Sequence, residues 1–305
     1  MTKKNIYVLS GFLGSGKTTL LKQLIQSLKD QIRRPAIIMN ELGSVSIDSE
    51  AVDKDTPLQE LLDGCICCTV QDQLDAKLQE LLMTETFDDL IIETTGAAHP
   101  VEAIDAIMSP LFSDRFEWKG IITTIDSFVW KNRESLTPQV MQLLYEQIKH
   151  ADLLLINKVD LITEMDQGMI SFEIQQINSH APLFLTQQSH VPLSALQNMS
   201  MSEKGERQAV HAKDHLHLTV VNHVFDQKVA LEDFENWIRS HTDRIYRMKG
   251  YVPFSHAANP MMFQYSYGMP IYMPEDMKMP KNLVIIGHGL DKSQIRSELK
   301  SLEMK

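Results

Sequence analysis

Short hydrophobic runs alternate with longer amphipathic segments over the first 190 residues of the chain. The runs have the length of strands and lie at 5–10, 36–40, 90–92, 120–125, 153–157 and 183–186. Between most of them, apolar residues recur at helical spacing, in segments 19–28, 70–83, 99–108, 138–149 and 169–179. Strands that alternate with helices predict an α/β fold, in which helices cover both faces of a mostly parallel sheet.

The periodic pattern breaks down after residue 187 and resumes, in a different form, at residue 215. We therefore predict a first domain over 1–188, a polar linker over 189–214 and a second domain over 215–305. The second domain combines strand patterns at 215–224, 244–249, 262–267 and 283–286 with helical patterns at 231–240 and 291–302. It is predicted to be a smaller α+β domain, with the methionine-rich segment 269–280 as a loop.

Charge and hydropathy exclude several classes of protein. The net charge is −11, from 29 Lys and Arg against 40 Asp and Glu. An acidic chain without a basic cluster is a poor candidate for binding nucleic acid or an anionic membrane. No apolar run approaches the roughly 20 residues that a bilayer span needs. The apolar start Ile6–Leu9 is soon interrupted by Gly11 and Lys17, without a cleavage site, so we expect a cytoplasmic protein.

The segment Gly11–Thr18 fits the pattern G-x-x-x-x-G-K-[ST] and lies between the first strand and the first helix. In such a loop, backbone N–H groups surround the phosphates of a nucleotide, and the lysine neutralises the β- and γ-phosphate oxygens. We expect Lys17 to be catalytic in this sense and the Thr18 hydroxyl to bind Mg²⁺. The predicted nucleotide-binding residues of this loop are Gly11, Gly14, Ser15, Gly16, Lys17, Thr18 and Thr19.

A second motif, Asn157-Lys158-Val159-Asp160, ends a hydrophobic strand and is typical of guanine recognition. The Asp160 carboxylate can accept both the N1–H and the exocyclic amine of guanine, while the Lys158 stem covers the base and Asn157 joins the loops. Adenine has no N1–H and would leave this carboxylate unpaired, so the motif favours GTP over ATP.

A third motif, Glu93-Thr94-Thr95-Gly96, follows another strand. Glu93 stands where most GTPases carry the acid that holds the Mg²⁺ shell, and we expect it to be catalytic with Lys17. The Gly96 backbone N–H is expected near the γ-phosphate. Because no Gln follows Gly96 to orient water, we predict slow intrinsic hydrolysis.

All three cysteines of the chain lie within four residues, at Cys65, Cys67 and Cys68. No regular helix or strand places all three side chains on one face, so a chelating loop is the natural conformation. Three thiolates with a fourth ligand suit tetrahedral Zn²⁺, and also Cu(I) or Co²⁺. A set of packed hydrophobic cysteines is the structural alternative.

Taken together and in this order, the motifs resemble those of the CobW family of P-loop GTPases, which are proposed metallochaperones. The similarity covers about residues 5–190, through Gly11–Thr18, Asn40–Gly43, Gly64–Cys68, Glu93–Gly96 and Asn157–Asp160. It extends more weakly into the second domain, through Phe234–Ile238, Tyr246–Gly250 and Phe263–Tyr265. It implies GTP- and Mg²⁺-dependent delivery of a transition metal, usually zinc, with Cys65, Cys67 and Cys68 as ligands. Glu41 matches a further Mg²⁺ or transition-metal ligand, whereas Ser44 replaces a second Glu of the family.

The sequence thus predicts a GTP-hydrolysing metallochaperone or metal insertase that releases zinc to a client metalloprotein. A nucleotide-dependent homodimer is a further expectation, and the second domain, with Trp237 and Tyr251 exposed, is the predicted client-docking part. The alternatives are passive zinc storage or sensing, and a redox-regulated GTPase in which Cys67 and Cys68 become oxidised. His211, His215 and His217 are interpreted as linker and strand-face residues rather than as a metal relay.

Overall fold

The computed structural model describes residues 3–40, 56–61, 70–97, 104, 110–111, 114–192, 195, 218–266, 268–277 and 279–303. The chain divides into two compact units. The larger comprises Thr2–Ala103 and Glu117–Asp214, and the smaller comprises Met1, Ile104–Phe116 and His215–Lys305. Within the described part of the chain, no helix is long and apolar enough to cross a membrane.

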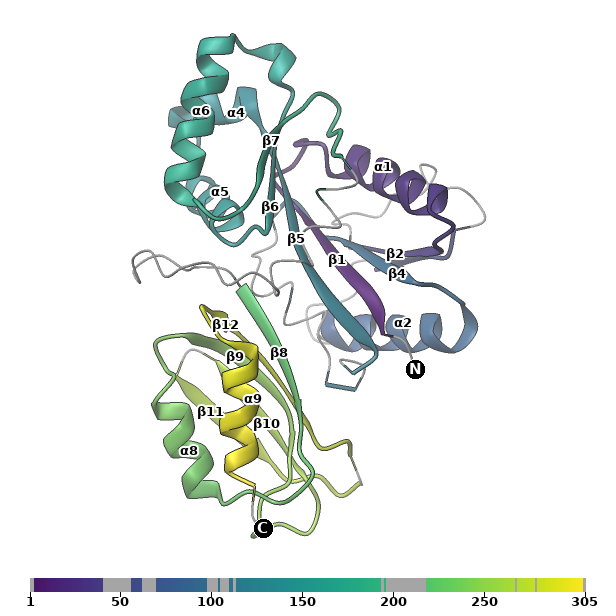
Figure 1. Cartoon of the computed structure of the whole chain (residues 1–305), viewed down its shortest axis with the longest axis vertical. Coiled ribbons are helices and arrows are strands. Elements are labelled where there is room, and N and C mark those ends of the chain that lie inside the picture. The colour runs from purple at the N-terminus through teal and green to yellow at the C-terminus, as the bar shows by residue number, and fades with distance from the viewer. Residues whose placement is uncertain are drawn as a thin grey trace. The chain divides into compact units, whose positions relative to one another are not determined.

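The larger unit is built on a seven-stranded sheet with the strand order β3-β2-β4-β1-β5-β6-β7 (Figure 1). The strands are β1 Lys4–Ser10, β2 Pro35–Asn40, β3 Leu58–Leu61, β4 Asp89–Glu93, β5 Phe116–Asp126, β6 Leu153–Asn157 and β7 Leu183–Leu185. The pairs β1/β4, β2/β3, β2/β4, β5/β6 and β6/β7 run parallel. The predicted parallel sheet is confirmed, and β3 is a short strand that the hydrophobic pattern missed.

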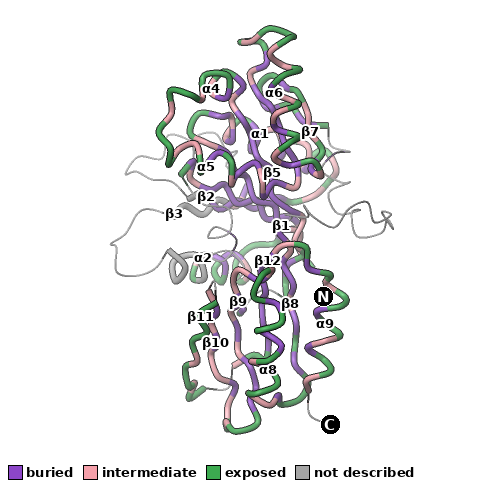
Figure 2. The backbone as a smooth tube through the Cα atoms, turned by 90° about the vertical axis from the view of Figure 1, so that its left-hand side faces the viewer, coloured by how far each residue is buried: buried purple, intermediate pink, exposed green. Residues whose placement is uncertain are grey.

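Helices cover both faces of this sheet. They are α1 Lys17–Asp30, α2 Val70–Thr84, α4 Ser127–Lys131, α5 Pro138–Lys149 and α6 Glu164–Ile177, with 3₁₀ turns η2 Arg133–Ser135 and η3 Val159–Leu161. In β6, Leu153 and Leu155 share a core with α1, while Leu154 and Ile156 share another with α5 and α6. The strand is therefore buried on both faces, which explains its continuous hydrophobic sequence. Figure 2 shows strands β1 and β5 of the same sheet coloured mostly as buried as well. Apart from Ile104, the predicted helix 99–108 lies outside the described residues.

The smaller unit contains a five-stranded sheet with the order β11-β10-β9-β12-β8. Its strands are β8 Leu218–Val224, β9 Ile245–Val252, β10 Met261–Ser266, β11 Met269–Met273 and β12 Asn282–His288, and its helices are α8 Leu231–Arg239 and α9 Lys292–Ser301. All four pairings between neighbouring strands are antiparallel. Phe234 of α8 makes edge-to-face contacts with Phe254 and Phe263, and so fixes the helix on the sheet. The predicted α+β unit is confirmed.

Two expectations for this unit are wrong. Part of the predicted methionine-rich loop forms strand β11, because Met269–Met273 pairs in register with β10, for example Met273 with Met262. Trp237 is buried rather than exposed, since it packs against Phe234 and its Nε1 donates to Glu298 Oε2 at 2.9 Å.

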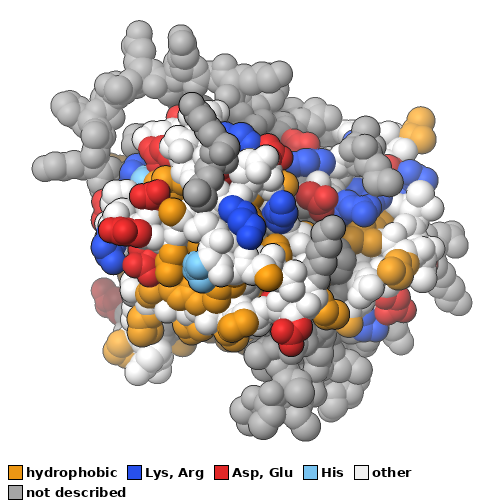
Figure 3. Space-filling model, turned by 90° about the horizontal axis from the view of Figure 1, so that it is seen from below, with side chains coloured by type: hydrophobic (Ala, Val, Ile, Leu, Met, Phe, Trp, Pro, Cys, Tyr) orange, Lys and Arg blue, Asp and Glu red, His pale blue; other side chains and the backbone are white. Residues whose placement is uncertain are grey.

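Figure 3 shows that hydrophobic side chains gather on one side of the face that is seen from below, while acidic and basic side chains mix over the rest.

Candidate functional site

The phosphate-binding loop follows β1 and requires glycine at three positions. Gly11, Gly14 and Gly16 have φ values of +133°, +72° and +113°, a region that other residues rarely adopt. A Cβ atom on Gly11 would lie 2.3 Å from the Thr124 carbonyl oxygen, and one on Gly16 would lie 2.3 Å from Asn157 Nδ2. The glycines therefore allow both the curved backbone and its close approach to the neighbouring strands.

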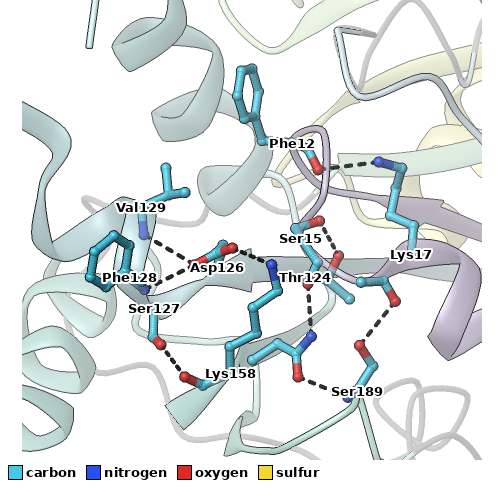
Figure 4. A network of polar contacts seen from close by, with 12 residues as sticks. Phe12, Ser15, Lys17, Thr124, Asp126, Ser127, Phe128, Val129, Lys158 and Ser189 are labelled. Carbon is cyan, nitrogen blue, oxygen red and sulfur yellow. Dashed lines mark hydrogen bonds and ion pairs between the residues drawn. The ribbon is translucent and has the colours of Figure 1, made fainter. Parts of the chain in front are cut away.

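Lys17 and Thr18 begin helix α1 with their side chains held at the loop. Lys17 Nζ donates to the carbonyl oxygens of Gly11 at 2.8 Å and Phe12 at 3.2 Å, which keeps the ammonium over the loop backbone (Figure 4). Thr18 Oγ1 donates to Glu93 Oε1 at 3.1 Å, and the Glu93 side chain is buried at the end of β4. A hydroxyl and a carboxylate are the oxygen donors that Mg²⁺ prefers, so this pair fits the ion.

Gly96 lies against the phosphate-binding loop. A Cβ atom at this position would lie 2.6 Å from the Leu13 backbone nitrogen, so only glycine fits. The Gly96 carbonyl accepts a hydrogen bond from Nε2 of the buried Gln147 on α5, at 3.2 Å. Gln147 was not among the predicted site residues, and its position in a helical pattern gives no sign of this contact.

Asn157 joins the end of β6 to the phosphate-binding loop. Its Nδ2 donates to the Ser15 carbonyl at 2.8 Å, and its Oδ1 accepts from the Ser189 backbone N–H at 2.8 Å. Ser189 Oγ in turn donates to the Gly16 carbonyl at 2.9 Å. Ser189 was assigned to the start of the linker, but it is fully buried and belongs to this network (Figure 4).

Lys158 follows with φ +62°, and its side chain turns toward the end of β5. Lys158 Nζ donates to Asp126 Oδ2 at 2.6 Å, and the Ser127 hydroxyl donates to the Lys158 carbonyl at 2.8 Å. Asp160 lies exposed in the turn η3, and Thr19 is exposed on the first turn of α1. Asp126 was missed, although a carboxylate directly after a buried hydrophobic run is a signal that sequence reasoning can use.

The predicted transition-metal ligands Glu41, Cys65, Cys67 and Cys68 lie outside the described residues, as do Ser44, His211, His215 and His217. Among the residues that the structure does describe, no group of three or more His, Cys, Asp or Glu is placed to hold a metal ion. The described part of the site therefore comprises the residues that the sequence predicts to bind the nucleotide and Mg²⁺.

Two family models match the chain. The model "CobW/HypB/UreG, nucleotide-binding domain" matches residues 5–185, and "Cobalamin synthesis protein cobW C-terminal domain" matches residues 219–303. Together they account for the larger part of both units.

The relatives are similar to this chain over different shares of their length. The "Zinc chaperone YjiA" of Escherichia coli is 27% identical over 323 residues, which covers 97% of this chain and 98% of that protein. The "Zinc-regulated GTPase metalloprotein activator 1" of Dictyostelium discoideum is 31% identical over 234 residues, covering 65% of this chain. This match spans about half (49%) of the Dictyostelium protein. The solved structure of the Zn(II)-bound YjiA GTPase from E. coli has a TM-score of 0.52 at 22% identity over 100% of both chains, which shows the shared fold.

Proposed function

The chain belongs to the CobW family, with the CobW/HypB/UreG nucleotide-binding domain over residues 5–185, and we propose that it is a GTPase that carries zinc and delivers it to a client metalloprotein. The observation that carries the guanine-nucleotide part is the joining of two motifs. Asn157, from the guanine-reading motif, bonds to the backbone of the phosphate-binding loop at Ser15. This bond supports the proposal, because it joins the segment that would read the base to the loop that would hold the phosphates.

The chain's own groups divide the work on the nucleotide. Lys17 lies over the loop and neutralises the β- and γ-phosphate oxygens, while backbone N–H groups between Gly11 and Thr19 surround the phosphates. Glu93 and Thr18 hold Mg²⁺, which supplies charge stabilisation to the phosphoryl group when it is bound. Gly96 presents its N–H to the γ-phosphate. Asp160 and Lys158 select guanine, and the lack of a Gln after Gly96 makes unassisted hydrolysis slow.

For the metal, Cys65, Cys67 and Cys68 supply three thiolates, and Glu41 is the candidate further ligand. Two relatives support zinc as the cargo, since one is named a zinc chaperone and the other a zinc-regulated GTPase metalloprotein activator. Thiolates that must stay reduced suit the cytoplasm. Nickel, cobalt or copper would compete for the same ligand set.

A thiolate zinc site explains why a carrier would need a nucleotide. Such a site binds zinc with about 10–16 kcal/mol, and about 16 kcal/mol corresponds to a Kd near 1 pM. With an association rate of about 10⁷ M⁻¹s⁻¹, release would take about a day. A coupling of about 1–3 kcal/mol between nucleotide and metal speeds release by about 5- to 150-fold. Hydrolysis that reshapes the Glu41 and Cys65–Cys68 segments would provide this coupling.

The client and the homodimer belong to the same proposal. A metalloprotein that accepts zinc by ligand exchange completes the delivery, and two copies that meet across the nucleotide would close the site during hydrolysis. Passive storage predicts no effect of zinc on GTP turnover. The redox alternative predicts thiol oxidation by peroxide without tight zinc binding.

The guanine assignment is tested by Asp160→Asn. The asparagine amide can donate a hydrogen bond where the carboxylate accepted one. Xanthine carries an oxygen in place of the exocyclic amine of guanine, and this oxygen can accept that bond. We expect the variant to bind xanthosine diphosphate more tightly than GDP, measured by calorimetry, with wild-type protein as the control. An unchanged preference for GDP would contradict the assignment of Asp160.

A further inference from the structure

Asp126 is a side chain that the proposed chemistry does not use, although it makes the shortest charged contact of the described site. It ends strand β5, directly beside Asn157 in the β5/β6 register. One carboxylate oxygen, Oδ2, accepts from Lys158 Nζ at 2.6 Å, and the side chain is only 10% exposed. The other oxygen, Oδ1, accepts from the backbone N–H groups of Phe128 and Val129 at 2.9 and 3.0 Å.

The two oxygens therefore perform two separable tasks. Oδ1 caps the first turn of α4, as Asp commonly does at a helix N-terminus. Oδ2 holds the ammonium of Lys158, whose side chain is still 35% exposed. The adjacent Ser127 fixes the Lys158 carbonyl through its hydroxyl. Figure 4 shows Asp126, Ser127 and Lys158 as one connected group.

We propose that Asp126 is a positioning residue for guanine recognition, which acts by holding the Lys158 side chain where its stem covers the base. This inference rests on the proposed reading of guanine by Asn157, Lys158 and Asp160. A free lysine side chain has many rotamers and must lose that freedom when a base binds. A lysine whose ammonium is already held by a carboxylate has lost this rotamer freedom before the base binds. The nucleotide therefore binds more tightly without any new contact to the protein.

A purely structural role of Asp126, as the cap of α4, is the competing explanation. Asp126→Ser separates the two roles, because serine remains a good N-cap but cannot reach and pair with the ammonium. Asp126→Asn likewise keeps the cap acceptor and removes the charge. Thr137→Ala is a matched control, because it removes the cap of α5, where Thr137 Oγ1 accepts from Val140 N–H at 3.4 Å, away from Lys158.

The test is calorimetric binding of GDP and of inorganic tripolyphosphate to the full chain. We expect Asp126→Ser and Asp126→Asn to weaken GDP binding about tenfold, and to leave tripolyphosphate binding unchanged because the phosphate-binding loop is intact. Thr137→Ala should bind both ligands like the wild type. Lys158→Met should weaken GDP binding by a similar factor, and adding Asp126→Ser to it should cost nothing further.

Three results would overturn the inference. The first is wild-type GDP affinity in Asp126→Ser, and the second is an equal further loss of GDP affinity when Asp126→Ser is added to Lys158→Met. The third is a loss of tripolyphosphate binding in Asp126→Ser, since the effect would then be structural. Asp160→Asn distinguishes this failure from that of the proposed function. If that variant switches to xanthosine diphosphate while Asp126→Ser behaves like the wild type, guanine recognition stands and only the role of Asp126 is wrong.

Discussion

The hydrogen bonds of Asn157 make its replacement by alanine a sharp test of the site. The Asn157 side chain satisfies two buried backbone groups, the Ser15 carbonyl and the Ser189 N–H, at 2.8 Å each. Removing one partner of a buried bond costs about 1–3 kcal/mol. Two such losses would cost about 2–6 kcal/mol, and we expect about 3 kcal/mol because water can enter beside the loop.

This loss converts into a measurable shift in melting temperature. For a unit of this size, each kcal/mol lowers Tm by about 2–4 °C, so Asn157→Ala should melt about 6–12 °C below the wild type. Differential scanning calorimetry of the nucleotide-free protein measures the shift. Asn132→Ala is the matched control, because the Asn132 amide bonds to the Phe128 carbonyl at 2.8 Å on the exposed surface. It should change stability by less than about 0.5 kcal/mol. Equal melting temperatures for the two variants would refute the reasoning.

Three further predictions concern other parts of the chain. Gly16→Ala should weaken GDP binding at least about tenfold in calorimetry, because its Cβ would meet Asn157 Nδ2 at 2.3 Å; Gly168→Ala, whose Cβ meets nothing within 4 Å, should bind normally. Arg33→Ala should destabilise the protein by about 2 kcal/mol in urea unfolding, because it removes a hydrogen-bond partner of the fully buried Asp89 carboxylate. Arg34→Ala removes a partly exposed pair with Asp88 and should cost less than about 1 kcal/mol. Burial lowers the pKa of His223 below its ordinary 6.5 despite the nearby Glu303, so the unfolded chain takes up a proton at a higher pH than the folded chain does. The smaller unit should therefore lose stability as the pH falls below 6.5, and His223→Gln should flatten that dependence in melting curves at pH 5.5 and 7.5.

Local sequence patterns were sufficient for most of the larger unit. Strand β1, the glycine loop and α1 were predictable because the hydrophobic run, the three glycines and the leucine spacing all act within 30 residues. Strand β6 was equally clear, since a parallel strand that is buried on both faces has a continuous hydrophobic sequence. These are the elements that place Lys17, Thr18 and Asn157 at the site.

The missed elements depend on partners that lie far away in the sequence. Strand β11 has the composition of a loop, and it becomes a strand only because β10 offers it a pairing edge. Ser189 and Gln147 reach Gly16 and Gly96 across 173 and 51 residues, so no local pattern indicates them. Trp237 was misjudged because its indole N–H bonds to Glu298 of α9, which lies 61 residues away in the sequence.

The most direct test of the account is a zinc titration against a competing chromophoric chelator. It compares nucleotide-free protein, protein with Mg²⁺ and GDP, and protein with Mg²⁺ and a non-hydrolysable GTP analogue, with Cys67→Ala as the control. A GTP-controlled carrier should change its zinc affinity by about 5- to 150-fold between the GDP and GTP-analogue states, and the control should lose tight binding. Equal zinc affinity and equal release rates in those two states would contradict the central claim.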